Sequence, residues 1–309
     1  MARGRPLPDE LASLPWRGPG PGRPELALPP GSMPLLGPAR GLRKRWRYVA
    51  AFCDELMLCA ARVQVGIAGQ TFWALLDRGN GELLERTRTR PPFGRGEVWS
   101  EYGDGAVWPV GAGERAGQGA VTRIVAGELV ATLKIGPGSW VESICPNGAG
   151  GYVWTRKRLA PIACEIRIPG RDPIRAQGHG IEDESAGYHP RHTIWSWSAG
   201  AGLAEDGRAV GWNLVSGVND PASNSERAIW VGGESFEPGP VSFATDLSSV
   251  SFDDGSKMSF RAEAERRASQ NLGLIRSSYR QPFGSFSGSL AGIGLHSGAG
   301  VMEDHDALW

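Results

Sequence analysis

The side chains that could do chemistry gather in the second half of this 309-residue chain. All five histidines follow residue 178, and three segments there combine carboxylates and tryptophans with histidines or amides: 178–197, 211–230 and 300–309. On a β-strand, side chains two positions apart share a face. A strand through the first segment would therefore place Trp195 and Trp197 together on an aromatic face. The pattern indicates a polar site walled by indole rings.

Carboxyl groups beside those rings are the candidates for acid–base chemistry. A carboxylic acid held against tryptophan and away from water resists ionisation, and its pKa can rise by up to roughly 3–5 units. It can then donate a proton near neutral pH, which typically accelerates a reaction by roughly 10²–10⁴-fold without a cofactor. The candidate catalytic residues are Glu226 and Glu303 as proton donors, with His192 and Asn213 to position them. The candidate substrate-binding residues are Trp195, Trp197, Trp212, His189, Asn224 and His305.

Each of these groups also has a structural interpretation. Tryptophans on strands commonly serve packing, and 224–226 has the composition of a turn. The acidic run 182–184 is interpreted as part of a solvated loop. The acidic end of the chain would ordinarily be a frayed tail, but Trp309 as the last residue favours a docked end.

Several reaction and partner classes lack their motifs. The chain has no G-x-S-x-G elbow, no Walker-type phosphate loop, no dinucleotide glycine pattern and no H-E-x-x-H helix. Its four cysteines form no C-x-x-C pair. We therefore predict no cofactor and no metal. Balanced charge, with 33 basic and 33 acidic residues, disfavours a nucleic-acid partner, and no apolar run is long enough for a membrane helix. The first residues lack the apolar core of a signal peptide, which predicts a cytoplasmic location.

Composition and periodicity predict an all-β fold. The chain has 45 glycines, and short apolar runs alternate with turn residues. Predicted hairpin strands cover 46–53 with 56–65, 71–77 with 82–88, 120–126 with 129–135, and 250–252 with 257–265. Period-two alternation in the last of these favours a strand that continues beyond it.

The predicted organisation has three parts. Residues 1–40 are rich in proline and glycine and form an extended arm, anchored by Trp16 and the Leu35–Leu36 pair. Residues 41–170 and 171–309 each have the size of a small β-barrel or sandwich, and the second carries the candidate site. The pattern lapses at 169–191, which we interpret as a long loop covering or lining that site.

Five short motifs resemble those of a known family. They are W-R-Y at 46–48, W-T-R-K at 154–157, H-x-x-W-x-W at 192–197, N-S-E-R at 224–227 and G-V-M-E-D-H at 300–305. In order and spacing they resemble the bacterial family called domain of unknown function 2804. That family is similar to two-domain lipocalin-like proteins, among them carotenoid hydratases and tocopherol cyclases.

The resemblance implies two lipocalin-like, calycin-type antiparallel β-barrel or sandwich domains around an apolar cavity. It also implies hydration or cyclisation of a hydrophobic molecule without a cofactor, and it transfers no catalytic residue. Three functions are open. The first is a cofactor-independent lyase or isomerase acting on a small hydrophobic molecule in a β-barrel cavity. The second is a non-catalytic carrier of a lipophilic ligand, with its carboxylates outside or neutralised by arginines such as Arg227. The third is a carbohydrate-active protein.

Overall fold

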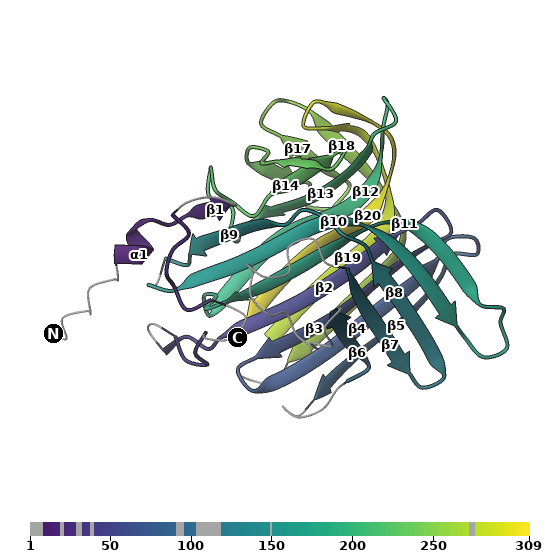
Figure 1. Ribbon diagram of the computed structural model, residues 1–309, viewed down its shortest axis with the longest axis horizontal. Helices are drawn as coiled ribbons and strands as arrows, with labels where there is room; N and C mark the ends of the chain where they lie inside the picture. Colours follow the sequence, from purple (N-terminus) through teal and green to yellow (C-terminus); the bar gives the residue numbers. More distant parts are fainter. Residues whose placement is uncertain are drawn as a thin grey trace.

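The described part of the chain is almost entirely β-structure. The computed structural model describes residues 9–18, 22–28, 33–37, 40–90, 96–102, 119–148, 150–271 and 276–309. The helix α1 (Asp9–Ala12) is a single turn. All strand pairs in the described residues are antiparallel, and they form two large sheets (Figure 1). The all-β prediction is therefore confirmed.

The first sheet contains the strands before residue 188. They are β1 (Trp16–Gly18), β2 (Lys44–Phe52), β3 (Leu56–Val65), β4 (Ala68–Asp77), β5 (Glu82–Arg90), β6 (Val98–Tyr102), β7 (Ala120–Ala126), β8 (Leu129–Ile135), β9 (Val141–Pro146), β10 (Tyr152–Arg167) and β11 (Ile174–Gly187). The strand order is β5-β4-β3-β2-β11-β10-β8-β7-β6, with β9 beside β10 and β1 beside β9. The sheet curls around an apolar core that includes Val49, Leu58 and Ile124.

The second sheet contains the remaining strands. They are β12 (His192–Ala204), β13 (Ala209–Ser216), β14 (Ala228–Val231), β15 (Glu234–Phe236), β16 (Val241–Phe243), β17 (Ser249–Phe252), β18 (Lys257–Asn271), β19 (Arg276–Leu290) and β20 (Ile293–Leu308). The order is β15-β14-β13-β12-β20-β19-β18-β17-β16. This sheet curls around its own core, which includes Trp212, Met258 and Phe286.

A third core lies between the two sheets and positions the site. It joins residues of β2–β4 and β11 to residues of β12–β14, β19 and β20, among them Tyr48, Ile181, Trp197 and Phe283. Each central strand therefore has two buried faces, one toward the interior of its own sheet and one toward the other sheet. Period-two alternation decides which side chain enters which core.

The hairpin predictions agree with the structure, but one predicted loop does not. Strands β3, β7 and β8 have the predicted bounds, and β18 continues as a strand to Asn271. The prediction of a loop over 169–191 is wrong, because Ile174–Gly187 forms the long strand β11, which pairs with both β10 and β2. The acidic run 182–184 is accordingly buried rather than solvated. The three carboxylates form ion pairs with basic side chains of β10 and β2. Because the acidic residues interrupt the apolar alternation, the sequence did not indicate a strand here.

The sheets change at residues 188–191, so β11 belongs to the first sheet. Division of the chain into folding domains 41–170 and 171–309 stays a prediction. The described part of the arm lies beside β9 and packs over the first sheet (Figure 1). Trp16 packs there as expected, whereas the side chains of Leu35 and Leu36 are exposed. This pair is held through its backbone instead, by a bridge from Leu36 to Leu42 and a hydrogen bond from N of Arg43 to the oxygen of Leu35 at 2.9 Å.

A close approach at Gly200 fixes how β12 packs on Trp212. A Cβ atom at Gly200 would lie 2.1 Å from Cζ2 of Trp212, which is fully buried. We therefore expect G200A to lower the free energy of unfolding by about 1–3 kcal/mol through overpacking, as measured by urea denaturation. The matched control is G136A, whose Cβ would have its nearest neighbour at 3.3 Å. A G200A protein as stable as wild type would contradict this packing.

Candidate active site

A cavity of about 240 Å³ lies between the two sheets, next to the shared core. Its walls are mainly aromatic and aliphatic. The aromatic lining residues are Trp46, Tyr48, Phe72, Trp195, Trp197, Tyr279 and Trp309. Ionisable side chains interrupt this lining at a few points. Most of them form two clusters, one around Glu226 and one around Glu303, and the clusters are coupled because Glu303 helps to raise the pKa of Asp183.

Strand alternation brings the two central tryptophans into the cavity. Trp195 and Trp197 occupy alternate positions on β12, and their face turns toward the first sheet. The ring of Trp197 packs edge-on against Tyr48 of β2 with centroids 5.3 Å apart. Its Nε1 donates to Oδ1 of Asn213 at 2.8 Å. The indole wall is therefore held by packing from one sheet and by a buried amide of the other.

A buried ammonium joins two carboxyl groups in the first cluster. The Nζ of Lys157 on β10 lies 2.5 Å from Oδ2 of Asp183 on β11 and 3.5 Å from Oε1 of Glu226. Lys157 and Asp183 are direct partners in the β10–β11 register. Glu226 comes from the turn between β13 and β14, and its Oε2 accepts a hydrogen bond from Nδ2 of Asn219 at 3.0 Å. All three ionisable side chains are at most 7% exposed.

This arrangement favours a protonated carboxyl group. Burial raises the pKa of both Glu226 and Asp183, and the single Lys157 ammonium opposes the rise. Burial alone would lower the pKa of Lys157, but the two carboxyls overcome it and raise that pKa. Asp183 makes the shorter contact with the ammonium. Glu226 is therefore the better placed of the two to hold the proton.

Two N–H donors fix Glu303 in the second cluster. Its Oε1 accepts from Nε1 of Trp195 at 2.9 Å, and its Oε2 accepts from Nε2 of Gln281 at 3.0 Å. Both partners donate, so the geometry suits a carboxylate with two acceptor oxygens. The ring of His305 packs on Trp195 with centroids 4.2 Å apart, and its Nε2 lies 2.8 Å from Oγ of Ser277.

A β-bulge directs a guanidinium toward the same region. Before the bulge, Met258 of β18 faces the core of the second sheet. The register shifts between Ala262 and Ala264, which inverts the alternation. Arg266 therefore faces the cavity, where its Nη1 donates to Oη of Tyr279 at 3.0 Å. Its charge is met by a carboxylate of Glu85 on β5 at 2.8 Å.

Comparison with known proteins identifies the family. Residues 147–309 match the family model described as domain of unknown function (DUF2804). The chain belongs to this family. The matched region contains Lys157, Asp183, Glu226 and Glu303, that is, the carboxyl groups of both clusters and the ammonium between two of them. No match was found among curated proteins.

The chain is also similar to solved structures of the lipocalin-like type. A protein assigned as AttH from Nitrosomonas europaea aligns at 14% identity with a TM-score of 0.55, covering 90% of this chain and 98% of that one. Kievitone hydratase from Nectria haematococca aligns at 11% identity with a TM-score of 0.46, covering 86% of this chain and 88% of that one. CghA aligns at 11% identity with a TM-score of 0.40 and the same coverage. The likeness concerns the fold alone, which is lipocalin-like with two curled sheets.

In this member of the DUF2804 family, the structure brings six of the ten predicted site residues to the cavity. They are Glu226, Glu303, Trp195, Trp197, His189 and His305. His189 packs against Trp46 with ring centroids 4.9 Å apart. Burial, with a smaller contribution from the Lys44 ammonium, lowers the pKa of His189 to about 3, so the ring is neutral. The cavity also lies between the sheets, whereas the sequence predicted it inside one barrel.

The other four predicted residues lie elsewhere. His192 is exposed and pairs with Asp306 at 2.7 Å, because it occupies the opposite face of β12 from Trp195. Trp212 pairs with Gly200 in the β12–β13 register, so it enters the core of the second sheet. Asn224 is exposed and lies in the turn between β13 and β14. Asn213 is buried behind the wall of tryptophans. Its Nδ2 donates a hydrogen bond to the backbone oxygen of Glu226 at 3.1 Å.

Sequence reasoning missed Lys157 and Asp183. The signal was present as two segments of opposite charge, Arg156–Lys157–Arg158 and Glu182–Asp183–Glu184, which are antiparallel partners in β10 and β11. Alternation sends the central pair to the cavity and the flanking pairs to the interior of the first sheet. Arg266 and Tyr279 had no such signal, because the bulge that orients Arg266 leaves no clear mark in the sequence.

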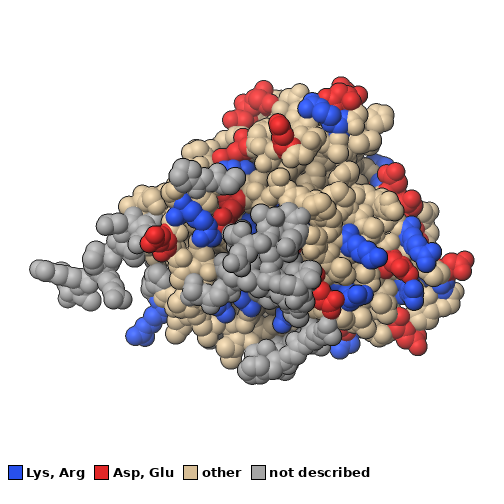
Figure 2. All heavy atoms as spheres, in the orientation of Figure 1, with Lys and Arg blue, Asp and Glu red and all other residues tan. Residues whose placement is uncertain are grey.

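Neither a metal cluster nor a membrane helix appears in the described residues. No group of three or more histidine, cysteine or acidic side chains among them is placed to hold a metal ion. None of the helices there is long and apolar enough to cross a membrane. On the face shown in Figure 2, acidic and basic side chains are interspersed.

Proposed function

We propose that the protein is a cofactor-independent acid–base enzyme, a lyase or isomerase that hydrates, cyclises or isomerises a small hydrophobic molecule in the cavity between the sheets. The observation that supports this most is the Glu226 carboxyl group, buried beside an aromatic cavity with its pKa raised by that burial. A protonated carboxylic acid in an apolar site is a general acid near neutral pH.

The proposed reaction begins with proton transfer from Glu226 to an electron-rich carbon or oxygen of the substrate. The negative charge left on Glu226 is stabilised by the Lys157 ammonium and by the Asn219 amide. Positive charge that develops on the substrate faces the indole rings, which attract cations. Glu303 supplies a second carboxyl group, held by Trp195 and Gln281.

The proton balance then depends on the second step. In a hydration, a C–O bond to water forms as the double bond is lost, and the surplus water proton returns to Glu226. In an isomerisation or cyclisation, the substrate loses a proton from another position. Glu226 accepts it directly, or Glu303 accepts it and releases it to solvent while Glu226 takes up a proton before the next turnover. Neither route needs an oxidant, a reductant or a bound cofactor.

The geometry supports catalysis over simple carriage. A carrier was expected to hold its carboxylates outside the cavity or neutralised by arginines such as Arg227. Glu226 and Glu303 are instead buried at the cavity, with exposures of 6% and 8%. Arg227 turns away and donates to the backbone oxygens of Pro221 and Pro238. The mainly apolar lining also disfavours a sugar, whose many hydroxyl groups need polar partners.

Ligand capture tests this proposal. Wild-type protein and E226Q are purified, and each is examined by native mass spectrometry followed by organic extraction. We expect E226Q to retain the substrate, and wild type to hold a product that differs from it by one water or is its isomer. The extracted substrate, added back, should be converted by wild type only. If both proteins retain the same unaltered molecule and neither converts it, the protein is a carrier.

A further inference from the structure

Glu226 stands on a turn rather than on a strand, so its position depends on what holds that turn. The turn covers residues 217–227, between β13 and β14. Asn219 and Asn224 adopt positive φ angles of 50° and 61°, a conformation that costs free energy for residues other than glycine. Within the turn, the backbone N–H of Glu226 donates to the oxygen of Asn219 at 3.1 Å. Such a turn needs support from neighbouring elements.

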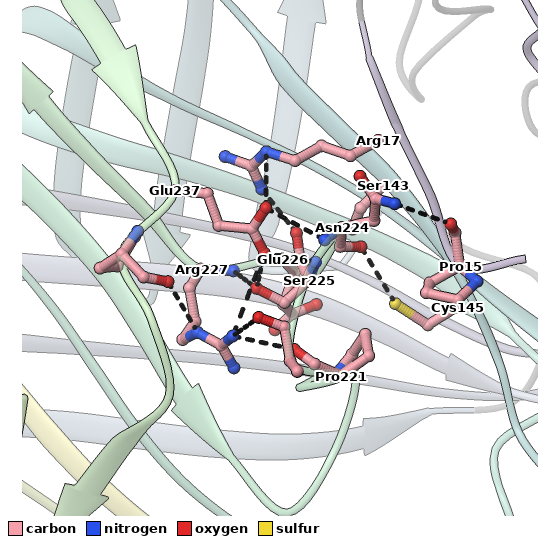
Figure 3. A network of polar contacts seen from close by, with 12 residues as sticks. Pro15, Arg17, Ser143, Cys145, Pro221, Asn224, Ser225, Glu226, Arg227 and Glu237 are labelled. Atoms are coloured by element: carbon pink, nitrogen blue, oxygen red, sulfur yellow. Dashed lines mark hydrogen bonds and ion pairs between the residues drawn. The ribbon is translucent and has the colours of Figure 1, made fainter. Parts of the chain in front are cut away.

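The N-terminal arm supplies support from outside the turn (Figure 3). Nη1 of Arg17, on β1, donates to the backbone oxygen of Ser225 at 2.5 Å. Nδ2 of Asn224 donates to the backbone oxygen of Pro15 at 3.2 Å. The arm therefore contacts the two residues that directly precede Glu226. Pairing of β1 with β9 fixes the arm itself, with Arg17 opposite Ser143.

Glu237 connects the arm and the turn from a second direction. Its Oε1 accepts from N and Oγ of Ser225 at 2.7 and 2.6 Å, and its Oε2 accepts from N of Asn224 at 3.0 Å. The same carboxylate lies 3.9 Å from Nε of Arg17. The two side chains are only 13% and 20% exposed. Arg17 and Glu237 thus form an ion pair, and each of them is hydrogen-bonded to the backbone of residues 224–225.

We propose that Arg17 is a positioning residue: with Glu237, it clamps the 217–227 turn so that Glu226 points into the cavity and stays shielded from water. This inference rests on the proposed function, because it assumes that Glu226 is the proton donor. It assigns the N-terminal arm a part in the site, although none of the arm's described residues lines the cavity. Loss of the clamp should admit water to Glu226 and lengthen its contact with Asn219.

The test measures the protonation of Glu226 through a bound probe. N-phenylnaphthylamine fluoresces in apolar pockets and is uncharged across the working pH range. We expect its fluorescence in the wild-type cavity to change as Glu226 ionises, and the change to be absent in E226Q. The charged and titratable groups around Glu226 are Lys157 of β10, Asp183 of β11, Cys145 of β9 and Arg17 of β1. The difference between wild type and E226Q isolates the contribution of Glu226.

The decisive variant is R17A/E237A, which removes one positive and one negative charge and therefore leaves the local net charge unchanged. We expect the midpoint of the fluorescence change to fall by on the order of 1 pH unit, since hydration favours the ionised carboxyl. The matched control is R23A/E142A, which removes a second ion pair of the described arm, between Arg23 and Glu142 at 2.7 Å, together with the hydrogen bond that Glu142 accepts from Nε1 of Trp154. It should keep the wild-type midpoint. R17K retains a charged donor for Ser225 and should also stay close to wild type.

The outcomes separate this proposal from the proposed function. A midpoint in R17A/E237A equal to or above that of wild type, with the change still absent in E226Q, overturns the role of Arg17 and leaves the proposed function standing. A change of the same size and midpoint in E226Q and in wild type shows that Glu226 is not the titrating acid, and both proposals then fail. If the double variant does not fold, R17Q/E237Q removes the same charges while retaining polar side chains, and the same shift in the same direction is expected.

Discussion

Replacement of Glu226 by glutamine is expected to lower kcat by about 10²–10⁴-fold. Glutamine keeps the size of the side chain and its hydrogen bond with Asn219, but it has no acidic proton to donate. Glu226 is one lining residue of a mainly aromatic and aliphatic wall, and glutamine has nearly the same shape, so binding of an apolar ligand should change little. The measurement is steady-state turnover of the substrate identified by extraction, with probe binding as the check on the cavity.

Two further variants sharpen this result. E263Q alters a carboxyl group that pairs with Arg78 at 2.9 Å and does not line the cavity, so its turnover should match wild type. E303Q tests the second cluster. Should E303Q lose turnover while E226Q keeps it, Glu303 is the essential carboxyl group and the assignment of Glu226 as proton donor is wrong. Full turnover in both E226Q and E303Q would rule out the carboxyl mechanism.

The second large effect concerns stability and comes from the interior of the first sheet. Glu182 is completely buried between the guanidinium groups of Arg47 and Arg158, with Nη2 of Arg158 2.6 Å away. E182Q would remove the negative charge that Arg47 and Arg158 share, while both guanidinium groups stay buried. We expect the free energy of unfolding to fall by about 3–5 kcal/mol, the usual cost of breaking a buried ion pair on one side. Urea denaturation near neutral pH measures it.

The same residue predicts a pH dependence. Burial alone would raise the pKa of Glu182, but Arg47 and Arg158 overcome it and lower the pKa to about 2. Because the folded-state pKa lies below that of the unfolded chain, this stabilisation is fully present above about pH 4.3 and is lost as the pH falls toward about 2. The contribution is about 3 kcal/mol. E182Q should therefore flatten the stability profile in that window.

A surface carboxylate provides the control for both measurements. Glu165 on β10 pairs with Arg167 at 2.8 Å, but the arginine is 67% exposed. E165Q should change the free energy of unfolding by less than about 1 kcal/mol, because water screens such pairs. Equal effects of E182Q and E165Q would contradict the picture of a buried charge network in the first sheet.

Local strand patterns could be predicted from the sequence because they depend on neighbours along the chain. Alternation and turn residues fixed β3, β7 and β8 to the residue. They also assigned Trp195 and Trp197 to one face of β12. Each of these assignments agrees with the structure. The same patterns did not identify β11 as a strand, because its buried face carries charged residues that are typical of a solvated loop.

The grouping of faces could not be predicted in the same way. Trp197 and Trp212 both belong to aromatic faces, yet they enter different cores because Gly200, not Trp197, is the partner of Trp212. That register depends on the pairing of β12 with β13 and on which side of the second sheet meets the first. No single strand carries this information.

The sequence by itself determined an all-β chain, the family motifs, and a set of candidates that includes two of the three carboxyl groups among the described cavity residues, Glu226 and Glu303. Only the tertiary structure decided that the cavity lies between the sheets and that Lys157 and Asp183 join Glu226 there. The physical reason is that alternation is a local property, whereas burial of a charge requires a partner from a distant strand. Lys157 became recognisable as part of the site only once β10, β11 and the 217–227 turn were in contact.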